Sequence, residues 1–195
     1  MVGGDQKKLA SGIALAFVVV ATLAGCSADS GEAAELSLGQ TKSPVQLLRN
    51  DAAGRIPPAV IAVVEDAQDV SVACLDEAAD PLGLRRSWHS TAIVTIEEGA
   101  KWRIETVVDD LINSYVDQGW VARPLGGSPT VKNTLLTSGA SFAEIRVASK
   151  VPDADIVSTS TEEIIESALI EVQVHGPCVE TGGAESEEVT RLEGR

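Results

Sequence analysis

The sequence predicts an α+β fold, an antiparallel sheet of about five strands with helices packed on one face. Two observations lead to this prediction. Five segments have the composition or the apolar–polar alternation of strands, and one long segment repeats its apolar residues with the 3.6 period of a helix. The helical segment separates the first two strand segments from the last three, an order that favours antiparallel pairing with the helices on one side.

Residues 43–54 form the first predicted helix. Ser43 suits the N-cap, Pro44 the first helical position and Gln46 the third position of a capping box. Two prolines then interrupt the chain. The apolar run from Pro58 to Val64 favours a second short helix, although the same run also fits a strand.

Residues 70–75 and 88–96 are predicted strands that pair as an antiparallel hairpin across the polar loop 76–86. The clearest helix follows, from Ala100 to Asp117. Gly119 suits the C′ position after it, so that the next residue packs back on the last turn. The apolar stripe of this helix consists of Ile104, Val108, Leu111, Ile112 and Tyr115, and Trp120 is expected to contact Tyr115.

Three further strands are predicted at 131–137, 142–149 and 168–175, the first two joined by a tight turn. The last strand alternates cleanly, and the residues 180–195 after it are predicted to form a loose acidic tail with at most a short helix near Val189. The inward-facing residues of the strand 168–175 are expected to be Ala168, Ile170, Val172 and Val174.

The first 26 residues have the organisation of an export signal. Lys7 and Lys8 precede an apolar run, 9–23, that is shorter than the ~20 residues of a membrane-spanning helix. The run ends in Leu23-Ala24-Gly25-Cys26, which resembles the lipobox of bacterial lipoproteins at all four positions. This resemblance implies cleavage before Cys26, a diacylglyceryl group on its sulfur and acylation of the new amino group. An uncleaved membrane anchor is the alternative.

The resemblance divides the chain into a signal peptide (1–25), lipidated Cys26 with a flexible tether to residue 42, one domain (43–179) and an acidic tail (180–195). The domain also resembles small lipoproteins of high-GC Gram-positive bacteria that have no assigned activity. The features that carry this resemblance are the Trp-containing strand after Cys74, the segment Asp117-Gln118-Gly119-Trp120 and the segment Gly176-Pro177-Cys178-Val179.

The predicted mature chain is strongly acidic. Removal of residues 1–25, with Lys7, Lys8 and Asp5, leaves 170 residues with 13 basic and 28 acidic side chains, a net charge of −15. Such a surface repels phosphate backbones and anionic headgroups, so we expect no nucleic-acid partner and no electrostatic docking on the bilayer. Cationic ligands are compatible with it, although a solvated acidic surface explains the same composition.

With Cys26 taken by lipid, Cys74 and Cys178 remain in an exported domain, which favours one disulfide over two buried free thiols. No metal site and no cofactor are expected. The two His residues are far apart in the sequence, and Asp153 and Asp155 begin like a calcium loop whose later positions lack oxygen ligands.

Two constellations resemble functional sites. Ser141 lies in a segment one residue short of the G-x-S-x-G nucleophile elbow, and Asp153 or Asp155 with His175 would complete a hydrolase triad. The elbow needs a strand-to-helix turn, however, and Ser141 is predicted to lie between two strands. The second constellation is Arg85, Arg86, Trp88 and His89, which reads either as a recognition patch or as a core Trp beside solvated Arg side chains.

We therefore expect an exported envelope lipoprotein, anchored by lipid to the extracytoplasmic face of the cell membrane. The expected role is non-enzymatic, a binding or assembly module for an envelope protein or ligand. The alternative is a lipid-anchored hydrolase. A pocket that unites Ser141, His175 and an acid would support the alternative, whereas an exposed apolar surface would support the binding module.

Overall fold

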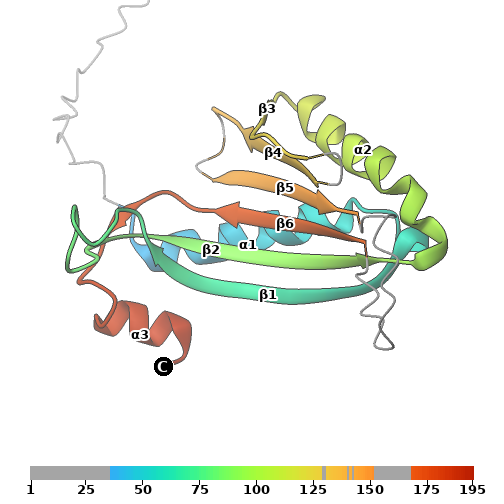
Figure 1. Cartoon of the computed structure of the whole chain (residues 1–195). Coiled ribbons are helices and arrows are strands. Elements are labelled where there is room, and N and C mark those ends of the chain that lie inside the picture. The colour runs from blue at the N-terminus through green and yellow to red at the C-terminus, as the bar shows by residue number, and fades with distance from the viewer. Residues whose placement is uncertain (1–35, 129–130, 140, 142, 152–167) are drawn as a thin grey trace, which may run out of the picture. The chain divides into compact units, whose positions relative to one another are not determined.

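The computed structural model describes residues 36–128, 131–139, 141, 143–151 and 168–195. In this part of the chain, seven strands form one antiparallel sheet in the order β1-β2-β6-β5-β4-β3, with β7 paired to the start of β2 (Figure 1). The strands are β1 (Ile61–Ala73), β2 (Arg85–Ile96), β3 (Val121–Pro124), β4 (Val131–Thr137), β5 (Glu144–Lys150), β6 (Leu169–His175) and β7 (Val179–Glu180). The helices are α1 (Leu38–Gly54), α2 (Ile104–Val116) and α3 (Glu187–Glu193), with short 3₁₀ segments η1 (Pro58–Val60) and η2 (Glu98–Arg103).

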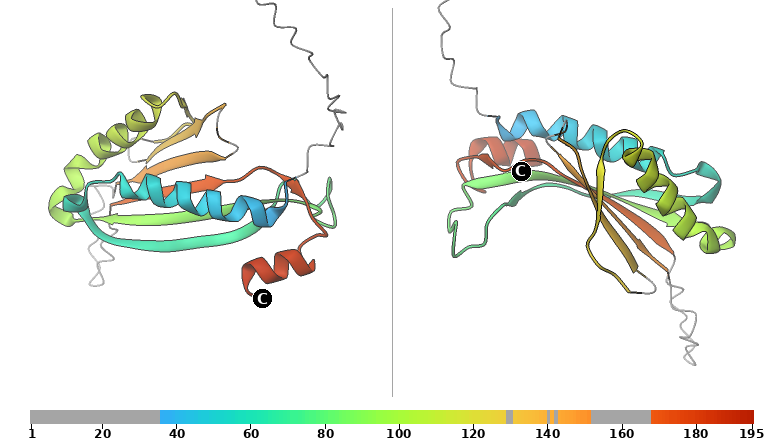
Figure 2. Two further views of the ribbon diagram at one scale, coloured as in Figure 1. Left: turned by 180° about the vertical axis from the view of Figure 1, so that it is seen from behind. Right: turned by 90° about the horizontal axis from the view of Figure 1, so that it is seen from above.

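Helices α1 and α2 cover the same face of the sheet (Figure 2). Helix α1 packs across β2 and β6, whereas α2 packs on β5 and beside β3. The expected α+β fold is confirmed, and β3 and β7 are additional short strands that the sequence did not reveal. The sheet side chains buried beneath the helices include Trp88, Ala92, Val94, Ile96, Leu136, Ile145, Val147, Ile170, Val172 and Val174.

Strand β6 is central and fits its sequence pattern. Ile170, Val172 and Val174 are fully buried, as is Ala168 just before the strand, so the predicted inward set is confirmed. The alternation was readable because β6 has a strand on each side and a helix on only one face.

Helix α1 begins at Leu38, and the predicted start at Ser43 is wrong. Ser37 is the N-cap: its hydroxyl accepts a hydrogen bond from the N–H of Gln40, whose side chain accepts one from the N–H of Ser37. Pro44 therefore lies inside the helix, where proline costs about 3 kcal/mol. Burial of Leu38 and other apolar side chains on the same helix face outweighs this cost. Residues 38–42 thus belong to the domain and not to the tether.

The helix predicted from Pro58 to Val64 is also wrong, and the alternative strand is correct. A single 3₁₀ turn ends at Val60. Strand β1 then pairs with β2, from Ile61 opposite Ile96 to Ala73 opposite Arg86. The β-branched side chains of this run favour an extended backbone, and the proline start accounts for the single turn before it. The predicted hairpin of the first two strands is confirmed, with β1 longer than expected.

Helix α2 and its C-terminus match the prediction, except that its first turn is the 3₁₀ segment η2. The N–H of Gly119 donates to the carbonyl of Val116 and the N–H of Trp120 to that of Tyr115, the two hydrogen bonds of a Schellman motif. Gly119 has a positive φ of 88°, which costs glycine little. The ring of Trp120 meets that of Tyr115 edge-on at 5.3 Å, so the predicted contact is confirmed.

The expected loose tail at 180–195 is wrong, although its short helix near Val189 is correct. Val189 is fully buried, and α3 packs beside the start of α1 and the end of β1. The Glu193 carboxylate accepts hydrogen bonds from the N–H and the hydroxyl of Ser71 on β1. Partial burial opposes ionisation of Glu193, but these hydrogen bonds outweigh it and lower its pKa.

The predicted disulfide is confirmed between Cys74 and Cys178, whose Cα atoms lie 6.1 Å apart. It joins the chain just after β1 to the chain just after β6. The lipidation site, Cys26, lies outside the described residues and remains a prediction.

Candidate functional site

The hydrolase constellation is not assembled in the described part of the chain. The Ser141 hydroxyl is hydrogen-bonded to the backbone N–H and carbonyl of Ala143, at 3.1 Å each, within its own turn. No hydrogen bond joins Ser141 to His175 among the described residues, and His175 instead packs against His89. Asp153 and Asp155, the candidate acids, lie outside those residues.

Trp88 lies in the core and is not part of a recognition patch. It is fully buried, and its indole N–H donates to the Asp69 carboxylate at 2.8 Å. The expectation of a core Trp is therefore confirmed. The expectation that the arginines are solvated is wrong for Arg86. Its guanidinium is buried and donates hydrogen bonds to the hydroxyl and the backbone carbonyl of Ser71 on β1. His89 points to the opposite face from Trp88 because successive strand residues alternate between faces.

A stacked histidine pair lies on the sheet face that carries neither α1 nor α2. His89 on β2 and His175 on β6 are directly opposite each other, and their rings are parallel within 7° at a centroid distance of 3.9 Å. Glu144 on β5 pairs with His175 in the same row. The sequence did not predict that His175 pairs with His89, because nothing in it says that β2 and β6 are neighbours.

Burial lowers the pKa of both imidazoles. For His89 it lowers the pKa to about 4, with a further contribution from the charge of His175. For His175 the pKa is also lowered by burial, with Glu144 acting in the opposite direction. Both rings are therefore neutral at pH 7. Because their planes are parallel, their in-plane nitrogen lone pairs do not converge on one point, so the pair does not form a ready metal site.

Within the described residues there is no cluster of three or more His, Cys, Asp or Glu side chains suited to a metal ion. Across the same residues, no helix has the length and apolarity required to cross a membrane.

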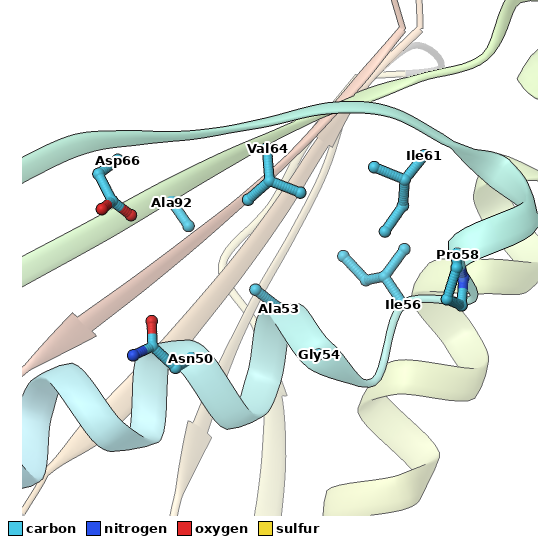
Figure 3. Close-up of a pocket in the computed structure, with 9 residues that line it drawn as sticks. All are labelled: Asn50, Ala53, Gly54, Ile56, Pro58, Ile61, Val64, Asp66 and Ala92. Carbon is cyan, nitrogen blue, oxygen red and sulfur yellow. The ribbon is translucent and has the colours of Figure 1, made fainter.

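A groove lies between α1 and the edge strand β1, with a pocket of about 310 Å³ (Figure 3). The side chains that line it are mostly apolar, with Asp66 at one end. Asp66 is held there by an ion pair with Arg49, a nearly buried cation on α1. The lining residues are Asn50, Ala53, Gly54, Ile56, Pro58, Ile61, Val64, Asp66 and Ala92.

Strand β1 is exposed over the stretch that borders this groove. Residues 62–68 are all exposed, and Val63 and Val64 keep 48% and 50% of their surface accessible. From 61 to 69 the strand carries Glu65, Asp66 and Asp69 and no basic residue. Of the surfaces described, this one combines apolar side chains, uniform charge, a pocket and an unpaired strand edge, and we take it as the candidate site.

This site was not among those predicted from the sequence. The available signal was a run of β-branched residues followed by acids, without a basic residue, between Pro58 and Val70. Because the same run also fits a helix, the sequence pattern did not place it at the edge of the sheet. The groove also depends on how α1 lies over β2, which no local pattern specifies.

Comparison with known proteins assigns the chain to no family. No protein-family model and no curated protein matches the chain. Among solved structures, the chain is similar to a crystal structure described as that of "the putative lipoprotein LppA from Mycobacterium tuberculosis". The two share 10% sequence identity over 75% of this chain and 79% of that one, with a TM-score of 0.38. A likeness at this level carries no argument about the fold or the function of this chain.

Proposed function

We propose that the protein is an exported lipoprotein, held by lipid on Cys26 at the outer face of the cell membrane, whose domain binds a partner through strand β1 and the adjoining groove. The observation that carries the anchor is the sequence Leu23-Ala24-Gly25-Cys26 behind a basic and apolar signal. One acyl chain holds a protein only weakly, whereas two or three give stable anchoring at ~0.8 kcal/mol per buried CH₂ group.

The disulfide supports export. Cys74 and Cys178 are bonded to each other, and such bonds persist in oxidising compartments outside the cytoplasm. The bond also leaves Cys26 as the remaining cysteine of the chain.

A binding role is favoured over catalysis by the make-up of the candidate groove. Its lining contains one charged side chain, Asp66, and that carboxylate is already paired with Arg49. Among the described residues that line the pocket there is no Ser, Cys, His or Lys, and the one carboxylate there, that of Asp66, is engaged by the Arg49 guanidinium. Exposed apolar side chains beside an unpaired strand edge suit the binding of a polypeptide.

The anchor is tested by Cys26→Ser in cells fed radioactive palmitate. We expect the parent protein to carry the label and to sediment with membranes, and the variant to lose both properties. The double variant Cys74→Ser/Cys178→Ser is the matched control, because it removes the other two cysteines, which form the disulfide, and should keep the label. The proposal would be contradicted if the parent carried no label and the Cys26→Ser variant still sedimented with membranes.

A further inference from the structure

We propose that the outer edge of β1, from Val63 to Asp66, binds an extended segment of a partner protein in which two apolar residues adjoin two basic residues, as an added strand of the sheet. This inference rests on the proposed role as a binding module and names the class of partner.

The outer edge of β1 is free to pair with an added strand, whereas the opposite edge of the sheet is protected. In the sheet formed by the described residues, the strand lies at one end of the order, so its outer backbone groups face none of these strands. Helix α3 covers the far end, where Glu193 takes up the outward N–H of Ser71. The opposite edge, β3, has four residues and ends at Pro124, which has no N–H to donate. Residues 61–69 are therefore the longest unprotected edge in the described part of the chain.

Two irregularities in pairing with β2 set the length of the site. The register shifts between Ile61 and Val63 and again between Asp66 and Gln68, as expected of β-bulges. Between them, Val63 to Asp66 pair without interruption and present a regular edge. An added strand on so short an edge gains few backbone hydrogen bonds, so matching side chains must contribute much of the affinity.

The exposed side chains of this stretch define the partner. Val64 and Asp66 lie on the groove side, opposite Val94 and Ala92, while Val63 and Glu65 lie on the other face. Each face of the edge thus offers one apolar and one acidic side chain. Successive residues of an added strand point to opposite faces of the sheet. A segment with two adjacent apolar residues beside two adjacent Lys or Arg residues therefore places one apolar and one basic side chain on each face, and it matches this pattern through apolar contact and opposite charge.

A second copy of the chain is a poor occupant of the edge. Antiparallel pairing of two such edges centred on Glu65 and Asp66 would set acids against acids, which is destabilising. The whole chain adds to this repulsion, with a formal net charge of −14. An apolar side chain of a basic partner, in contrast, can enter the pocket between Ile61 and Ala53 (Figure 3).

The test uses the lipidated protein purified from membranes in a neutral detergent, with fluorescent peptides followed by anisotropy at low salt. The probe is the nonapeptide Val-Val-Lys-Lys-Val-Val-Lys-Lys-Val with both ends blocked, called here the Lys–Val peptide. One comparison peptide replaces its central Val by Pro, which keeps the charge but removes a backbone donor and disturbs the extended ladder. The other replaces every Lys by Glu.

We expect the Lys–Val peptide to bind, the Glu–Val peptide not to bind, and the Pro peptide to bind at least about tenfold more weakly. Glu65→Lys in the protein should weaken binding of the Lys–Val peptide by about three- to tenfold. Glu105→Lys is the matched control, because it makes the same charge change at an exposed position on α2 and should leave binding nearly unchanged.

Equal binding of the Lys–Val and Pro peptides would overturn the inference by showing attraction through charge alone. Equal weakening by Glu65→Lys and Glu105→Lys, or loss of peptide binding because the protein dimerises through β1, would overturn it as well. These outcomes leave the acyl label on Cys26 intact, so they are distinguishable from failure of the anchor.

Discussion

At the scale of single residues, the histidine pair is the clearest source of pH dependence. Folding lowers the pKa of His89 from 6.5 to about 4. Between these pH values the imidazole is protonated in the unfolded chain and neutral in the folded protein. The pair therefore contributes stability at neutral pH that is lost as the pH falls from about 6.5 towards 4.

His89→Phe tests this effect, because it keeps an aromatic ring against His175 and removes one titrating group. Between pH 7 and pH 4.5 the free energy of unfolding should fall for both proteins, and we expect the fall to be about 1–2 kcal/mol smaller for the variant. This figure allows for solvent screening at a half-buried site. Urea denaturation at a series of pH values measures the difference. Parallel stability curves for the two proteins would show that the pair does not titrate as described.

At the scale of elements, the start of α1 is the most direct test of the corrected domain boundary. Ser37→Ala removes the N-cap acceptor and should destabilise the protein by about 1 kcal/mol. Ser43→Ala changes an exposed position inside the helix, where Ala has the better helix propensity, and should alter stability by less than about 0.5 kcal/mol. Chemical denaturation compares the two variants. The reverse ranking would place the helix start at Ser43.

The elements that the sequence predicted well are those whose pattern reflects a simple local environment. Strand β6 alternates because one of its faces is covered by helix, and the Gly119-Trp120 cap depends only on neighbours in the chain. The predictions were wrong for elements whose conformation depends on packing against distant parts of the chain. Pro44 marks a helix start by local rules, yet here the burial of Leu38 extends the helix past it.

The same distinction applies to the candidate site. The hairpin of β1 and β2 was predictable, but its position at the sheet edge, its bulges and the groove beside α1 follow from the order of all the strands. The histidine pair likewise forms because β2 and β6, which are far apart in the sequence, are neighbours in the sheet. No spacing rule within the sequence brings His89 to His175.

At the scale of the whole molecule, the disulfide connects segments 104 positions apart, just after β1 and just after β6. Closing a loop of this size stabilises by up to ~4.7 kcal/mol in the chain-entropy model. We expect Cys74→Ala/Cys178→Ala to lower the free energy of unfolding by about 2–4 kcal/mol, as measured by urea denaturation.

The matched control is the parent protein treated with a strong reductant, which should reach the stability of the double variant, while the double variant itself should not respond. A parent whose denaturation midpoint is unaffected by full reduction would show that the cross-link contributes nothing to the fold.

The central claim is that this chain works as a lipid-anchored domain outside the cytoplasm, and the state of its N-terminus tests that claim most directly. Mass spectrometry of the protein extracted from membranes reads the first residue and any group attached to it. We predict an N-terminal peptide that begins at Cys26 and carries the mass of a diacylglyceryl group, with or without an amide-linked acyl chain. A peptide that continues through Leu23-Ala24-Gly25 into an unmodified Cys26 would contradict the account.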